Sequence, residues 1–121
     1  MTTDRSALAF LGFGEAAQAF ATGFQSTGAR AYDIKTDGSE AAARRAEYAA
    51  HSIVEAATCA DACASADIVF SMVTADQAEV AAATAGQSDL NGAFFFDCNS
   101  CAPDTKRRSA RLIEAAGGRY V

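Results

Sequence analysis

Two glycines separated by one residue follow an apolar run near the start of the chain, in the stretch "LAFLGFGEAAQAF". From Gly12 to Ala17 the residues fit the pattern G-x-G-x-x-G/A, in which the first glycine permits a tight turn. The second, Gly14, lets the backbone approach a pyrophosphate, which then binds the amide groups at the start of the following helix. The third position needs only a small side chain, and Ala17 supplies one. The loop therefore predicts a dinucleotide site.

An acidic residue at a suitable distance strengthens this prediction. Asp33 lies 19 positions after Gly14, at the end of the next predicted strand, where an acid hydrogen-bonds the 2′-hydroxyl of a ribose. Its charge would repel a 2′-phosphate, so we expect NAD to be preferred over NADP. Lys35 keeps NADP open, because its ammonium group could turn toward a phosphate.

A second polar segment, "DCNSCAP", follows the apolar run at 93–98, which is expected to be a buried strand. If that run is a strand of the same sheet, it delivers Asn99 and Ser100 to the edge where nicotinamide and substrate would meet. The alternative is that the two side chains only form the turn and cap the next helix.

The elements that must position these residues alternate between short β-type runs and alanine-rich helical runs, which is typical of βαβ units. We predict an α/β fold with a Rossmann-type doubly wound sheet, mainly parallel, of about six strands in the order 3-2-1-4-5-6. The strands are expected at 8–13, 29–34, 67–73 and 93–98, with a short strand or loop at 51–56 and a last strand beginning at 119. Helices are expected at 15–26, from Ser39 onward with Ser39 or Asp37 as N-cap, briefly at 58–66, and at 75–85 and 103–116.

Length and composition limit what the chain can be. Its 121 residues suit one domain, and a net charge of −5 argues against nucleic acid as a partner. The N-terminal stretch lacks the long apolar run of a signal peptide and no later stretch approaches about 18 consecutive apolar residues, so we expect a cytoplasmic protein without a membrane partner. The four cysteines, Cys59, Cys63, Cys98 and Cys101, are interpreted as free thiols, with a metal or redox pair as the alternative.

Three segments in order, "FLGFGEAAQAF", "DIVFSMVTADQA" and "DCNSCAPDTKRR", resemble the N-terminal cofactor domain of the β-hydroxyacid dehydrogenase superfamily. That group contains 6-phosphogluconate dehydrogenase and 3-hydroxyisobutyrate dehydrogenase. The chain departs from the family pattern at Ala16 and Ala17, where Met-Gly is usual, and at Asn99 and Ser100, where Ser-Thr is usual. Ile34 stands where NADP-using members often carry arginine, which again favours NAD.

The resemblance implies a role for each matching residue. Asn99 would lie on the nicotinamide side, and Ser100, with Asn99, would bind a β-hydroxyacid substrate. The cofactor-binding residues would be Gly12, Phe13, Gly14, Glu15, Ala16, Asp33, Ile34, Lys35, Val73, Thr74 and Asn99.

The resemblance also implies an NAD(P)-dependent dehydrogenase that transfers hydride to or from a CH–OH carbon. The acid/base lysine is expected in a helical C-terminal domain that also forms a homodimer. We expect residues 1–121 to be the NAD(P)-binding domain, with no catalytic residue of its own and no activity alone. The alternative is a dinucleotide-binding or sensing module without catalysis.

Overall fold

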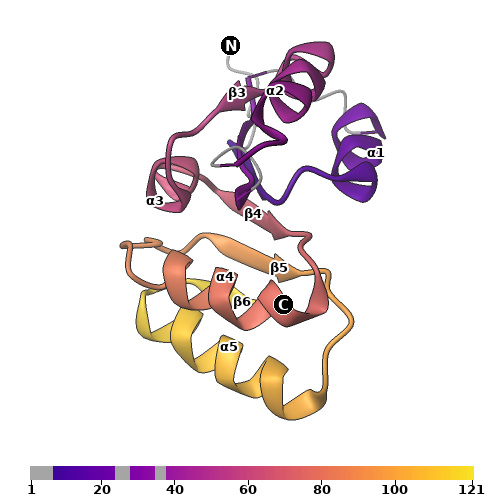
Figure 1. Cartoon of the computed structure of the whole chain (residues 1–121). Coiled ribbons are helices and arrows are strands. Elements are labelled where there is room, and N and C mark those ends of the chain that lie inside the picture. Colours follow the sequence, from indigo (N-terminus) through magenta and orange to yellow (C-terminus); the bar gives the residue numbers. More distant parts are fainter. Residues whose placement is uncertain (1–6, 24–27, 35–37) are drawn as a thin grey trace.

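The computed structural model of the chain describes residues 7–23, 28–34 and 38–121, and it contains a single six-stranded sheet flanked by helices (Figure 1). The strands are β1 (Leu8–Leu11), β2 (Arg30–Tyr32), β3 (Val54–Glu55), β4 (Ile68–Ser71), β5 (Phe94–Asp97) and β6 (Arg119–Tyr120). The helices are α1 (Glu15–Gly23), α2 (Ala41–Ala50), α3 (Cys59–Cys63), α4 (Ala78–Ala85) and α5 (Pro103–Ala115), with a 3-10 turn, η2 (Ala75–Gln77), before α4.

The sheet has the predicted topology. Its strands are all parallel and lie in the order β3-β2-β1-β4-β5-β6, so the α/β Rossmann-type prediction is confirmed. The order reverses between β1 and β4, where Phe10 is in register with Phe70. Ligands of such sheets bind beyond the carboxyl ends of the strands at this reversal point.

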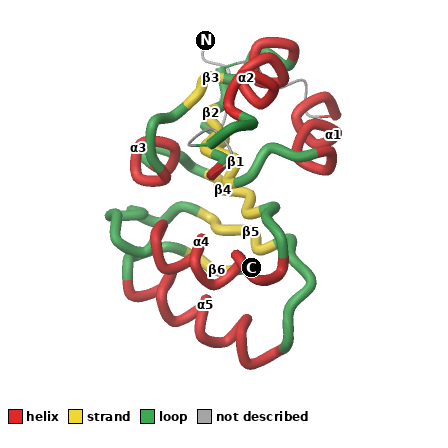
Figure 2. Tube along the Cα trace, in the orientation of Figure 1, coloured by secondary structure: helices red, strands yellow, loops and turns green. Residues whose placement is uncertain are grey.

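Helices cover both faces of the sheet (Figure 2). On one face, Ala17 and Ala21 of α1 and Tyr48 of α2 pack against Phe10 and Phe70 of the central strands. On the other face, α3, α4 and α5 bury a second cluster around Leu11, Val69 and Phe95. The alanines suit this packing because small side chains let the helices approach the strands closely.

Phenylalanine rings stack across the first of these faces. The ring centroids of Phe10 and Phe70 are 5.6 Å apart, and those of Phe70 and Phe96 are 5.5 Å apart. Such pairs stabilise a fold by about 0.5–1.5 kcal/mol beyond the apolar area that they bury. The three phenylalanines are in register on β1, β4 and β5, each one residue before the end of its strand.

Two local predictions are corrected. The run at 93–98 was expected to be a buried strand, yet Phe94 is 40% exposed, because only β6 lies beyond β5 in the sheet. The Arg119 guanidinium lies over one face of the Phe94 ring, 5.0 Å from its centroid. The N-cap of α2 is Glu40 rather than Ser39, with no hydrogen bond from its side chain, and Asp37 lies outside the described residues. The brief helix predicted at 58–66 is α3. Thr58 is its N-cap, and the Thr58 side chain accepts a hydrogen bond from the Asp61 N–H.

Candidate functional site

The glycine loop joins the carboxyl end of β1 to the start of α1, and its two glycines serve different purposes. Gly12 has a φ of +85°, and a Cβ atom there would lie 2.3 Å from the backbone oxygen of Met72, so only glycine fits. A Cβ atom at Gly14 would meet nothing within 4 Å. Gly12 is therefore required by the fold, whereas Gly14 borders open space where a ligand could lie.

Both backbone groups of Phe13, the residue between the glycines, are hydrogen-bonded. Its N–H donates to Asp33 Oδ2 at 2.8 Å, and its carbonyl accepts from Arg44 Nη1 at 2.5 Å and from Gln18 Nε2 at 3.2 Å. The phenyl ring is fully buried against Tyr48 and Phe10. Phe13 thus anchors the loop to the core, and its N–H is occupied by Asp33 rather than open to a pyrophosphate.

Asp33 is 7% exposed and belongs to the same hydrogen-bonded group. Its Oδ2 lies 3.4 Å from Nε of Arg44, which in turn contacts Glu47 Oε1 through Nη1 at 2.8 Å. Sequence reasoning missed Arg44. Its spacing of four residues from Tyr48 was the available signal, because that spacing puts both side chains on the face of α2 that packs against the sheet.

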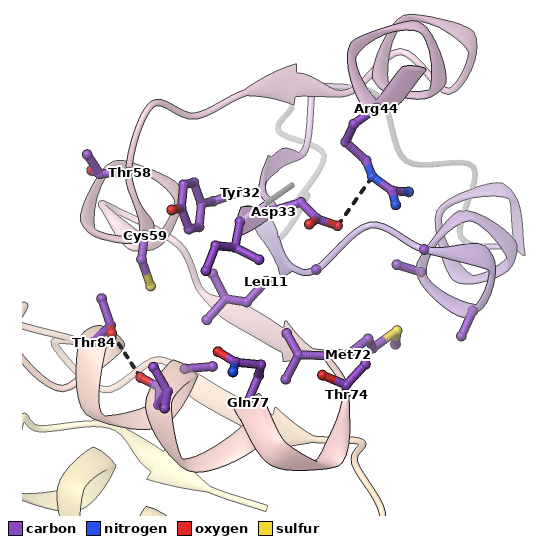
Figure 3. A pocket seen from close by; sticks show the side chains of 18 of the residues that line it. Leu11, Tyr32, Asp33, Arg44, Thr58, Cys59, Met72, Thr74, Gln77 and Thr84 are labelled. Atoms are coloured by element: carbon purple, nitrogen blue, oxygen red, sulfur yellow. Dashed lines mark hydrogen bonds and ion pairs between the residues drawn. The ribbon is translucent and has the colours of Figure 1, made fainter. Parts of the chain in front are cut away.

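A cavity of about 570 Å³ lies beyond the carboxyl ends of β1, β2 and β4 (Figure 3). Of the cofactor-binding residues predicted from the sequence, those that line it are Gly12, Gly14, Glu15, Ala16, Asp33, Ile34, Val73 and Thr74. Phe13, Asn99 and Ser100 do not line it, and Lys35 lies outside the described residues. The structure therefore brings together most of the predicted loop residues, but not the pair expected at the substrate end.

The wall opposite the glycine loop was not predicted. It is formed by the segment from Ala57 to Cys59 at the start of α3 and by Val80, Ala81 and Thr84 of α4, with Tyr32 between them. Figure 3 shows Thr58, Cys59 and Tyr32 on one side and Thr84 and Gln77 on the other. This half is mostly apolar, and such a surface suits the flat ring of a nucleobase.

Asn99 lies beside the cavity and acts on its wall. It is 8% exposed, and its Oδ1 accepts from the Val73 N–H at 2.8 Å while its Nδ2 donates to Ser71 Oγ at 3.1 Å and to Asp97 Oδ1 at 2.8 Å. These bonds hold the segment after β4 against the end of β5. Ser100, by contrast, is exposed.

Asp97 ends β5 with a side chain that is 2% exposed and has several donors around it. Lys106 Nζ lies 3.1 Å from its Oδ1, and the Tyr120 hydroxyl donates to its Oδ2 at 2.5 Å. Burial by itself raises the pKa of Asp97, but the surrounding donors outweigh burial and the pKa lies below its usual range. Burial and the bond to Asp97 raise the pKa of Tyr120. Lys106 therefore links α5 to the end of β5.

All four cysteines are free thiols in the structure. Cys59 and Cys63 are buried on one face of α3, and the hydrogen bond between them lowers the pKa of Cys59 against the effect of burial. The same bond and burial raise the pKa of Cys63. Among the described residues no group of three His, Cys, Asp or Glu side chains could hold a metal ion. None of the described helices is long and apolar enough to cross a bilayer.

A parallel sheet in this order, with a glycine loop and a cavity at the point of reversal, defines a dinucleotide-binding domain of the Rossmann type. Over residues 7–100 the chain matches the model of the family described as NADP oxidoreductase, coenzyme F420-dependent. The chain belongs to this family. No functionally curated protein matches it significantly in sequence.

Several solved structures share the fold of this chain. A conserved hypothetical protein from Sinorhizobium meliloti 1021 is 35% identical with a TM-score of 0.82, and the alignment covers 95% of this chain and 40% of that one. The 3-hydroxyisobutyrate dehydrogenase of Mycobacterium tuberculosis is 22% identical (TM-score 0.77, 95% and 38% covered). A reductive aminase from Aspergillus terreus, in complex with NADPH and ethyl-5-oxohexanoate, is 24% identical (TM-score 0.74, 95% and 39% covered).

The chain thus spans about two fifths of the length of the solved structures it matches. The resemblance to the N-terminal domain of β-hydroxyacid dehydrogenases is confirmed, and the chain is a pyridine-nucleotide-binding oxidoreductase domain. It also shares its fold with the reductive aminase. The preference for NAD is not confirmed, since the family description names NADP.

Proposed function

We propose that the chain is the NADP(H)-binding domain of an oxidoreductase that acts on a β-hydroxyacid. The observation that carries the proposal is the pair of glycines at the cavity. Gly12 lets the loop pass against Met72, and Gly14 leaves space beside the start of α1. A pyrophosphate fits such a space, because unbonded N–H groups at a helix N-terminus attract anions.

Each part of the cavity has a role in this proposal. The backbone at Glu15 and Ala16 would bind the pyrophosphate, the apolar wall between α3 and α4 would hold the adenine, and Val73 and Thr74 would lie along the path to the nicotinamide. Asn99 would not contact the cofactor itself but would position Val73, whose N–H donates a hydrogen bond to Asn99 Oδ1. When bound, the nicotinamide ring supplies or accepts the hydride.

The substrate class rests on the segment "DCNSCAP", which resembles the substrate-binding segment of β-hydroxyacid dehydrogenases. Ser100 is exposed at the end of β5, where its hydroxyl can donate to a substrate carboxylate or hydroxyl. In this proposal the acid/base lysine and the homodimer contacts lie in a helical domain outside these 121 residues. The alternative substrate class is an amine or imine, as the name of the reductive aminase suggests, in place of a hydroxyacid.

Calorimetric titration of the chain with NADPH, NADH and ATP tests the proposal, because ATP shares adenine, ribose and phosphates but not the nicotinamide half. We expect saturable binding of NADPH that is tighter than that of ATP. In heteronuclear NMR spectra, the amide signals of Gly14, Glu15 and Val73 should shift on addition of NADPH, while that of Arg119, at the far edge of the sheet, should not. No saturable binding of either pyridine nucleotide would refute the proposal.

A further inference from the structure

We infer that Arg44 is the residue that selects the 2′-phosphate of NADP(H), an inference that rests on the proposed cofactor. The arginine comes from α2 and not from the segment directly after β2. Figure 3 shows its side chain reaching from that helix toward Asp33 at the edge of the cavity. Asp33 stands at the end of β2, where the adenosine ribose of a dinucleotide binds in a sheet of this order.

Within the part of the chain that the structure describes, some N–H groups of the guanidinium have no acceptor. Arginine carries five N–H groups, and Nη1 donates to Phe13 O and Glu47 Oε1. Within the described residues no hydrogen bond is made by Nη2, and the buried Nε has none either, although Asp33 Oδ2 lies 3.4 Å away. Arg44 is 8% exposed and lines the cavity. A buried N–H without an acceptor costs free energy, and a phosphate oxygen would relieve that cost.

The charges at this end of the cavity change what Asp33 implies about the choice between NAD and NADP. An aspartate at the end of β2 with no cation beside it repels a 2′-phosphate, which was the reason for expecting NAD. Here the permanently charged Arg44 lies against Asp33 and offsets its charge, with Glu47, 39% exposed, on the other side of the guanidinium. The carboxylate holds the Phe13 N–H, and the guanidinium provides the planar set of donors that suits phosphate.

Two adenosine ligands isolate the contribution of the 2′-phosphate: adenosine 2′,5′-bisphosphate and 5′-AMP, which differ only in that group. For Arg44→Met we expect the affinities for the bisphosphate and for NADPH to fall by about tenfold to a hundredfold, as for a lost charged hydrogen bond. The affinities for 5′-AMP and NADH should change by less than about threefold. Arg44→Lys should recover part of the loss.

Arg45→Met is the matched control, because the neighbouring arginine pairs with Glu55 on the surface and does not line the cavity. It should leave all four affinities unchanged. Asp33→Asn keeps an acceptor for the Phe13 N–H but removes the charge next to Arg44, so it should tighten the bisphosphate more than 5′-AMP. If Arg44→Met fails to fold because Asp33 loses the neighbouring positive charge, the double variant Asp33→Asn/Arg44→Met is compared with Asp33→Asn.

Losses of equal size for the bisphosphate and 5′-AMP would overturn the inference, since Arg44 would then only hold the loop through Phe13. Unchanged bisphosphate affinity would overturn it as well. Both results leave the proposed function intact, because the unmodified chain would still bind NADPH. Failure of the unmodified chain to bind any of the four ligands would instead refute the proposed function.

Discussion

Oδ1 of Asn99 accepts a hydrogen bond of 2.8 Å from the backbone N–H of Val73, which joins the segment after β4 to the segment after β5. Nδ2 of the same side chain donates to Ser71 and Asp97. With both ends of its amide engaged inside the protein, Asn99 positions the cavity wall instead of offering the amide to a ligand. Its effect on a cofactor is exerted through Val73, which does line the cavity.

Replacing Asn99 should therefore affect folding and binding together. Asn99→Ala leaves Val73 N–H and Ser71 Oγ without their partner, which should lower the free energy of unfolding by about 1–3 kcal/mol. NADPH affinity should fall with it, because the Val73 segment loses its support. Urea unfolding and calorimetry measure the two effects. Ser100→Ala, an exposed neighbour, is the control, and equal stability of the two variants would contradict the role given to Asn99.

The two glycines of the loop should respond differently to substitution. Gly14→Val should bind no NADPH yet keep its melting temperature, because the side chain enters open space where the pyrophosphate would lie. Gly12→Ala should unfold at a markedly lower temperature, since its Cβ would collide with Met72 O in a backbone conformation disfavoured for alanine. Thermal unfolding followed by circular dichroism, with calorimetry of the folded variant, separates the outcomes. Retained NADPH binding by Gly14→Val would argue against the loop as the pyrophosphate site.

Asp97 should make stability depend on pH in the acidic range. Its pKa is lowered in the folded protein, so its contribution is present above the ordinary aspartate pKa of about 3.9 and is lost as pH falls through the lower folded value. Asp97→Asn should be less stable at pH 7 by about 1–3 kcal/mol, and the difference from the unmodified chain should shrink below about pH 4. Urea unfolding between pH 2 and 7 measures this. Asp104→Asn, at an exposed ion pair, is the control, and a difference independent of pH would be inconsistent with the ionised Asp97.

The thiols should be alkylated in an order set by exposure. Cys98 is exposed and Cys101 partly exposed, whereas Cys59 and Cys63 are buried, so iodoacetamide should reach the second pair only after unfolding. Burial and the neighbouring Asp97 charge raise the pKa of Cys98, so its alkylation rate should keep rising above pH 9. Peptide mass spectrometry over time gives each rate. Modification of Cys59 before Cys98 would show that α3 opens in the folded protein.

Patterns that repeat along the chain were sufficient to predict the fold. Apolar strands alternating with alanine-rich helices indicated the six-stranded order, and the G-x-G-x-x-A loop indicated which end of the sheet forms the cavity. Ala17, expected at the small-residue position of the loop pattern, is buried against the sheet. These features depend on neighbouring residues and on helical spacing, which a sequence displays directly.

Contacts between distant residues could not be predicted in this way. Asp33 was expected to face a ribose, and nothing in the sequence indicated that the Phe13 N–H, 20 residues earlier, would bond to its carboxylate. Arg44 and Arg45 are adjacent in "AAARRAEYAA" and look alike there. Only the orientation of α2 buries the first and exposes the second. Likewise, the exposure of Phe94 depends on β5 being close to the edge of the sheet.

The peptide group of Phe13 is held from both directions, with its N–H bonded to Asp33 and its carbonyl bonded to Arg44. The loop at the start of α1 therefore adopts one shape as soon as the chain folds, and a nucleotide does not have to order it. Preorganisation of this kind reduces the entropy lost on association. We expect stopped-flow traces of nucleotide association to show a single phase whose rate rises linearly with concentration, without the plateau that a slow loop closure would impose.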